Sequence, residues 1–190
     1  MLPLSKPFPR GLQYTSKEVG STMGGRRLCA IEVVDVGHVV QDFPCLHKLH
    51  IEGRINKLPN HQEFSPYLAK LTLLGSRLVE DPMPIVEKLP YLRVLRGWEA
   101  FIGKQMVCSE KGFPQLKSLL SQGLPNLQKW TVKAGAMHSL CHLEITDCNK
   151  LVTVPHGLKF VSMLKELEIQ WMPREFKHRL EEEGDDFYKV

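Results

Sequence analysis

The sequence predicts an α/β solenoid, in which short strands from successive repeats share one parallel β-sheet. Three observations predict this fold class. A leucine frame recurs at an almost constant interval, a proline-containing pair precedes most copies of the frame, and the chain of 190 residues is 43% hydrophobic and 24% charged, which is enough apolar material for a buried core.

The frame L-x-x-L-x-L begins six times, at intervals of 22, 24, 24, 24 and 24 residues. Sixteen of the eighteen residues in slots one, four and six are aliphatic, and all twelve in slots one and four are leucine. This frame at a period of about 20–29 residues is typical of leucine-rich repeats. The six frames are Leu46/Leu49/Ile51, Leu68/Leu71/Leu73, Leu92/Leu95/Gly97, Leu116/Leu119/Ser121, Leu140/Leu143/Ile145 and Leu164/Leu167/Ile169.

Each frame is expected to form one strand of a leucine-rich-repeat horseshoe of about six repeats. Slots four and six lie two residues apart and point inward, whereas slots three and five point outward on the concave face. Gly97 and Ser121 in slot six should weaken the centre of the stack. Proline precedes the first four frames, in Phe43-Pro44, Ser65-Pro66, Leu89-Pro90 and Phe113-Pro114, where no ladder hydrogen bond is yet required.

Three regions are predicted along the chain. Residues 1–42 form an irregular N-terminal segment, either a degenerate repeat or a cap, with a weak Leu28/Ile31/Val33 echo of the frame. The Val33–Val36 stretch could pair with the open edge of the sheet. Residues 43–172 hold the repeats, and residues 173–190 form a polar C-terminal cap.

The convex segments are expected to be mostly irregular, without long helices, because proline-containing turn signals interrupt them. In the fifth repeat the frame continues through Cys148 and Leu151, which predicts that Cys148 is buried and structural. The odd number of five cysteines at irregular spacing favours a reducing compartment over a disulfide framework.

No catalytic, cofactor or metal site is expected. The common phosphate-loop, dinucleotide, nucleophile-elbow and zinc-protease motifs do not occur. Two groups contain residue types that bind metals, Cys45/His47/His50 and Cys141/His142/Cys148. In both groups the strand ladder should point the side chains in different directions.

The outward residues are the candidate partner-binding site, because solenoids commonly bind partners on the concave face. Their charge changes along the stack, from basic in the first four repeats to acidic in the last two, which suggests docking of an acidic partner. A solvated face without a partner is the alternative interpretation. The candidate residues are His47, Lys48, His50, Lys70, Arg93, Arg96, Trp98, Lys117, Glu144, Glu166 and Glu168.

The remaining composition excludes other classes. The net charge of +4 is only mildly basic, and there is no aromatic-basic RNA motif, so nucleic-acid binding is not expected. No apolar run is long enough for a membrane span, and the first nine residues lack the layout of a signal peptide. A cytoplasmic location is therefore expected.

From about Phe43 to Val190 the sequence resembles the C-terminal leucine-rich-repeat region of plant coiled-coil nucleotide-binding disease resistance proteins. The resemblance covers about four-fifths of the chain, although Gly97 replaces the hydrophobic residue that the family would show there. The segments that carry it are Lys57–His61, Leu78–Met83, Phe101–Cys108, Gly112–Leu116, Leu124–Leu127 with Trp130, Gly135–Met137, Leu164–Ile169, Met172–Phe176 and Asp186–Val190.

The resemblance implies a sensor module that acts in intracellular defence against pathogens, without the family's nucleotide-binding switch. The implied partners are a pathogen effector, a guarded host protein, or the nucleotide-binding domain of a receptor. The alternative function is a stand-alone scaffold or adaptor, for example a substrate-recognition module of a ubiquitin ligase. Such an adaptor would be indicated by an F-box-like helix near the N-terminus, and residues 1–41 show no such amphipathic pattern.

Overall fold

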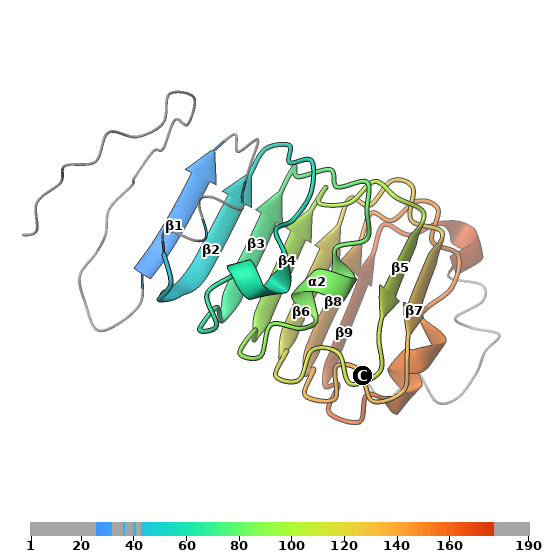
Figure 1. The fold of residues 1–190 in the computed structure, drawn as a ribbon. Helices are drawn as coiled ribbons and strands as arrows, with labels where there is room; N and C mark the ends of the chain where they lie inside the picture. The colour runs from blue at the N-terminus through green and yellow to red at the C-terminus, as the bar shows by residue number, and fades with distance from the viewer. Residues whose placement is uncertain (1–25, 32–35, 37–39, 41–42, 177–190) are drawn as a thin grey trace, which may run out of the picture.

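The main sheet of the solenoid contains seven parallel strands (Figure 1). The computed structural model describes residues 26–31, 36, 40 and 43–176. In spatial order the strands are β1 (Arg26–Ile31), β2 (Leu46–Glu52), β3 (Lys70–Leu74), β4 (Val94–Trp98), β6 (Ser118–Gln122), β8 (His142–Thr146) and β9 (Glu166–Gln170).

The six predicted frames form six of these strands, and the register places equal slots opposite one another. The slot-four leucines pair in a continuous row, and the slot-six residues form the next inward row. The prediction of a leucine-rich-repeat solenoid is therefore confirmed. The slot-four row is Leu49, Leu71, Leu95, Leu119, Leu143 and Leu167.

An additional strand, β1, covers the edge of β2 at the N-terminal end. The sequence placed this pairing at Val33–Val36, but the strand lies earlier, at Arg26–Ile31. Residues 33–35 lie outside the described residues, and Val36 is buried in the core. The weak frame echo around Leu28 therefore indicated the position of the strand better than the valine-rich stretch did.

The prolines that precede the frames occupy tight turns. In three of the four repeats with this proline, the N–H of the first frame leucine donates to the carbonyl three residues earlier, as in Leu46 to Phe43 at 3.2 Å and Leu68 to Ser65 at 3.1 Å. Pro44 and Pro66 are then the second residues of these turns, where the fixed φ of proline is favourable. The proline therefore favours the turn, and its missing N–H is tolerated because the strand has not yet begun.

The residue that follows each framed strand adopts a left-handed conformation. In this row every φ lies between 45° and 95°, although only three of the six residues are glycine. Each N–H in the first five members donates to the last strand carbonyl of the next repeat, at 2.7–3.1 Å. The row, which we call the exit row, consists of Gly53, Gly75, Glu99, Gly123, Asp147 and Trp171.

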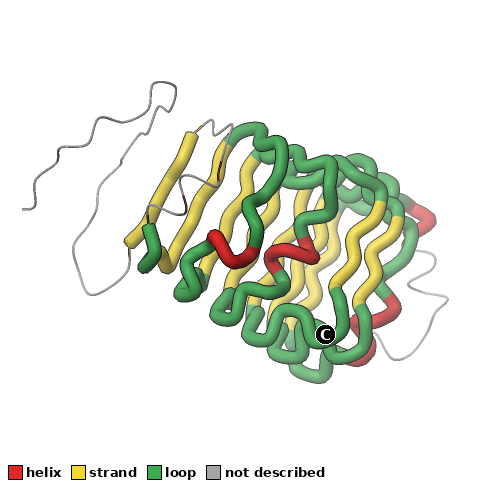
Figure 2. The backbone as a smooth tube through the Cα atoms, viewed as in Figure 1, coloured by secondary structure: helices red, strands yellow, loops and turns green. Residues whose placement is uncertain are grey.

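The return side contains a second parallel sheet that the sequence analysis did not predict (Figure 1). Its strands are β5 (Gln105–Cys108) and β7 (Lys129–Val132), and their inward residues pack into the same core as the framed leucines. The helical segments whose bounds the structure describes are short, namely η1 (His61–Glu63), α2 (Met83–Val86) and η2 (His156–Phe160) (Figure 2). Among the described residues the convex side is thus mostly loop, as predicted, and no helix there is long and apolar enough to cross a membrane.

Two carboxylates fix β5 to the preceding repeat. Asp81 accepts backbone hydrogen bonds from Met83 at 2.9 Å and from Val107 at 2.8 Å, and the buried Glu87 accepts one from Ser109 at 2.7 Å. Burial raises the pKa of Asp81 above 3.8, and the nearby Glu87 carboxylate adds to the rise, while the two backbone N–H groups oppose it.

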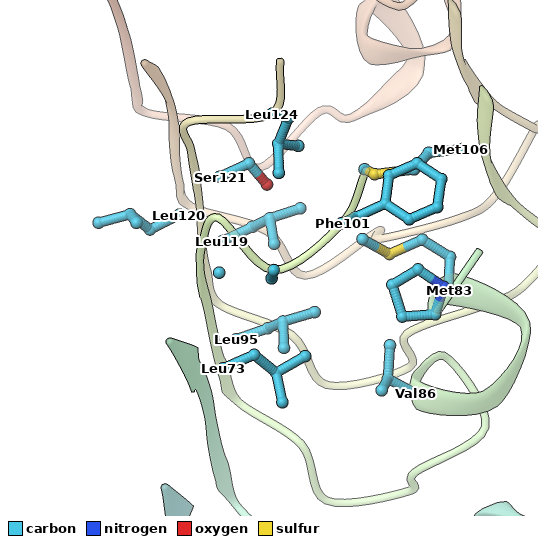
Figure 3. A pocket seen from close by; sticks show the side chains of 13 residues that line it. Leu73, Met83, Val86, Leu95, Phe101, Met106, Leu119, Leu120, Ser121 and Leu124 are labelled. Atoms are coloured by element: carbon cyan, nitrogen blue, oxygen red, sulfur yellow. The ribbon is translucent and has the colours of Figure 1, made fainter. Parts of the chain in front are cut away.

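A small cavity interrupts the core at the two slot-six departures. It lies between framed leucines on the strand side and Met83, Phe101 and Met106 on the return side (Figure 3). Gly97 and Ser121 line it side by side, because they are register partners. The space is about 20 Å³, roughly that needed for one water molecule, in apolar surroundings.

Candidate functional site: the concave face of the main sheet

The outward residues of the main sheet form three rows that cross the strands. We call the surface made by these rows the concave face. From β2 to β9, the first row is Lys48, Lys70, Val94, Ser118, His142 and Glu166; the second is His50, Thr72, Arg96, Leu120, Glu144 and Glu168; the third is Glu52, Leu74, Trp98, Gln122, Thr146 and Gln170.

A groove of about 230 Å³ lies over β2, β3 and β4. Five of the candidate residues from the sequence line it: Lys48, His50, Lys70, Arg96 and Trp98. The structure thus brings residues that are up to 50 positions apart in the sequence into one depression. Leu49, Thr72 and Leu74 complete the lining.

The groove is positively charged with one aromatic wall. Lys48 and Lys70 are directly opposite in the register, and Arg96 lies one strand beyond Thr72. The Nε2 atom of His50 is buried without a hydrogen-bond partner, and it lies 3.9 Å from a Glu52 carboxylate oxygen. Trp98 is 38% exposed, so its ring can contact a ligand as well as the groove. These groups suit an anionic ligand that also presents an apolar side chain.

The opposite end of the concave face is acidic. Glu144 and Glu168 are register partners on β8 and β9, and His142 Nδ1 lies 2.7 Å from Glu166 Oε2. Thr146 donates its hydroxyl hydrogen to Glu144 at 3.4 Å, and the Gln170 amide donates to Glu168. Ligand atoms from His142, Glu144 and Glu168 lie within 4.8 Å of one another, so the cluster concentrates negative charge around one histidine.

The three remaining candidate residues lie at the rim where the strands begin. Backbone hydrogen bonds connect this rim, since the N–H of Lys117 donates to the Arg93 carbonyl at 2.8 Å. His47 stacks on Tyr67 with ring centroids 6.0 Å apart. Arg93 and Lys117 are exposed beside the first row and do not line the groove.

The sequence analysis missed the uncharged part of the site. Thr72 and Leu74 in the groove, and Val94 and Leu120 between its two charged ends, occupy the same outward slots as the predicted residues. The slot number alone could have identified Thr72, Val94 and Leu120. None of the three carries a charge, so the charge pattern of the slots does not mark them.

Among the described residues, the cysteines do not join the histidines in either of the two groups of metal-binding residue types. The predicted burial of Cys148 is confirmed, and its thiol donates to the Thr146 carbonyl at 3.6 Å. Burial raises the pKa of Cys148 to about 11 and that of Cys108 to about 12, so both remain thiols at neutral pH. His142 meets Glu144 and Glu168 rather than Cys141 and Cys148.

Known relatives share this sequence over most of its length. The chain is 44% identical over 164 residues to a probable disease resistance RPP8-like protein 4, covering 84% of the chain and 18% of that relative. It is 41% identical over 179 residues to a disease resistance RPP8-like protein 3 (94% and 19%), and 43% identical over 153 residues to disease resistance protein RPP8 (80% and 17%). All three relatives are from Arabidopsis thaliana.

The chain spans less than a fifth of the length of these relatives. No family model matches it. The similarity nevertheless covers 80–94% of the chain at 41–44% identity, and it agrees with the resemblance found in the sequence. This chain is therefore a leucine-rich-repeat region homologous to a segment of the RPP8-like plant disease resistance proteins.

Proposed function

We propose that this chain is the recognition region of a plant disease resistance protein and binds a protein partner on its concave face during intracellular defence. The observation that carries the proposal is the groove over β2–β4, which gathers five candidate residues on a fold homologous to disease resistance proteins. Because Lys48, Lys70 and Arg96 line that groove, the partner contributes an acidic surface.

Three kinds of partner fit this role: a pathogen effector, a host protein that the receptor guards, and the nucleotide-binding domain of a receptor. Binding to any of them requires complementary side chains and no reactive group, so we assign no catalytic role. Free thiols at Cys45, Cys108, Cys141 and Cys148 support a reducing compartment such as the cytoplasm. The names of the relatives favour this role over the stand-alone adaptor.

The proposal is tested by disrupting the gene in its source plant and restoring it with variants. Wild type should restore resistance to pathogen growth, whereas Arg96→Glu, which reverses a charge in the groove, should not. Lys129→Glu is the matched control, because Lys129 is an exposed cation on β7 of the return side. Full restoration by Arg96→Glu would exclude the groove, and unchanged resistance after disruption would exclude the defence role.

A further inference from the structure

The charges on the concave face are separated into two ends. Within each end, like charges lie directly opposite on neighbouring strands: Lys48 faces Lys70, and Glu144 faces Glu168. Such pairs destabilise a sheet, because a directly opposite like charge is only about 5 Å away at the Cβ atoms. A cationic group at the acidic end would relieve the repulsion between Glu144 and Glu168, and an anionic group at the other end would meet Lys48 and Arg96 in the groove.

The two ends do not neutralise each other across the sheet. Strand β6 lies between them and presents only the uncharged Ser118, Leu120 and Gln122. Arg96 on β4 and Glu144 on β8 are therefore two strands apart, about 10 Å along the sheet, and among the described residues no ion pair joins them. Complementary charge for both ends can thus come from one bound molecule that crosses β6.

The centre of the concave face is apolar. Val94 and Leu120 are half-buried, and Trp98 is exposed at the edge of the groove. Trp98 lies opposite Leu74 on β3, and Leu120 lies opposite Arg96 on β4, so these apolar side chains adjoin the basic groove. A tryptophan beside an aliphatic side chain is the kind of contact that contributes most to protein binding, especially when charged residues surround it. The face therefore has three zones, basic over β2–β4, apolar around Trp98 and Leu120, and acidic over β8–β9.

We propose that the concave face binds one extended protein segment of bipolar charge, which lies across the strands. Its acidic part contacts the basic groove, an apolar residue packs on Trp98 and Leu120, and its basic part contacts Glu144, Glu166 and Glu168. This inference rests on the proposed function in one respect, namely that the concave face binds a protein. From β2 to β9 there are five strand spacings, about 24 Å, so the segment has about seven to nine extended residues.

Synthetic peptides test the inference with the full chain. Two fluorescent nonapeptides carry four glutamates, a central leucine and four lysines, in either order, and a third has the same composition with alternating charges. In anisotropy titrations, at least one block peptide should bind about tenfold more tightly than the alternating peptide. Arg96→Glu and Glu168→Lys should each weaken that binding about tenfold, whereas Lys129→Glu should leave it unchanged. Equal thermal melting of the variants shows that they are folded.

The inference is overturned if the alternating peptide binds as tightly as both block peptides. Two results together would also overturn it. A peptide with only the glutamates and the leucine would bind as tightly as the better block peptide, and Glu168→Lys would not weaken binding of that block peptide. In that second case the groove is a simple anion site, and the proposed defence function still stands on the plant experiment. Conversely, unchanged resistance after disruption of the gene would exclude the proposed defence role without altering peptide binding.

Discussion

The sequence determines the structure of the strand side and of the return side of this solenoid in different ways. On the strand side, leucines at fixed slots form continuous rows from β2 to β9. On the return side, β5 and β7 pair in the middle of the chain, and Asp81 and Glu87 fix β5 through hydrogen bonds that have no equivalent in the other described repeats. The comparison teaches that the period encodes the strand side and that individual residues encode the return side.

Removing a buried leucine from the strand side should have the largest effect on stability. Leu143→Ala should lower the free energy of unfolding by about 3 kcal/mol, because Leu143 is fully buried. Leu167, its register partner on the edge strand β9, is only partly buried, so Leu167→Ala should cost about 1 kcal/mol. Urea unfolding of both variants measures the difference, and equal losses would mean that burial does not decide the contribution of a slot.

Removing a carboxylate from the return side should have the next largest effect. Asp81→Ala should lower the free energy of unfolding by about 2 kcal/mol, because the N–H groups of Met83 and Val107 lose their acceptors. Glu80→Ala is the control, since Glu80 is exposed next to it in the sequence. If urea unfolding shows no difference between these two variants, Asp81 does not hold β5 in place.

The same carboxyl group predicts a pH dependence of stability. The pKa of Asp81 is raised in the folded chain, mainly by burial, so the folded state holds this proton more tightly than the unfolded state does. Its contribution is fully present below the unfolded pKa of 3.8 and is lost as the pH rises through the folded pKa. The stability of wild type relative to Asp81→Asn should therefore be greatest in acid and decline toward neutral pH. A difference that grows with pH would show that the pKa is lowered instead.

Two substitutions in the exit row should change stability in opposite directions. Glu99 has a φ of 45°, so Glu99→Gly should stabilise the fold by about 0.5–1 kcal/mol. Gly123 has a φ of 65°, and a Cβ atom there would lie 3.3 Å from the Glu99 side chain, so Gly123→Ala should destabilise it by about 1 kcal/mol. Thermal melting distinguishes the two, and shifts of the same sign would contradict this account of the exit row.

Filling the central cavity should have the smallest effect. Ser121→Val replaces a hydroxyl with two methyl groups beside the space that Gly97 leaves open, and it should raise the free energy of unfolding by about 0.5–1 kcal/mol. Ser121→Ala, which removes the hydroxyl without filling the space, is the control. A valine variant that melts below the alanine variant would mean that the cavity is too narrow to accept the added methyl groups.

The strand side could be predicted because its physical rule is periodic. Two inward leucines in each strand must meet their equivalents in the next repeat, so the frame gives both the strands and their faces. The exit row is equally regular in structure. It could not be recognised in the sequence, because Glu99, Asp147 and Trp171 stand where the other members of the row are glycine. The strands β5 and β7 are also 24 residues apart, but the pattern is four residues long and occurs only in these two described segments, with different residue types, so it is too short to stand out in the sequence.

The candidate site, like the fold, could be predicted only where its residues follow the repeat. Slots three and five identify which charges share the concave face, and five of the predicted residues line one groove. Slot two has no defined face in the alternation, so the position of Arg93 and Lys117 at the rim could not be read from the period. The carboxylates Asp81 and Glu87 were not predicted, because hydrogen bonding to β5 depends on the path of the return segments.

The most direct test of the division between a binding side and a supporting side is to map where the bipolar peptide lies. A photoreactive leucine at the centre of the better block peptide can be crosslinked to the full chain and located by mass spectrometry. We expect the crosslinks on Trp98, Leu120 and the neighbouring residues of β4 and β6. Crosslinks concentrated on β5 and β7 would place the binding surface on the return side and contradict the account.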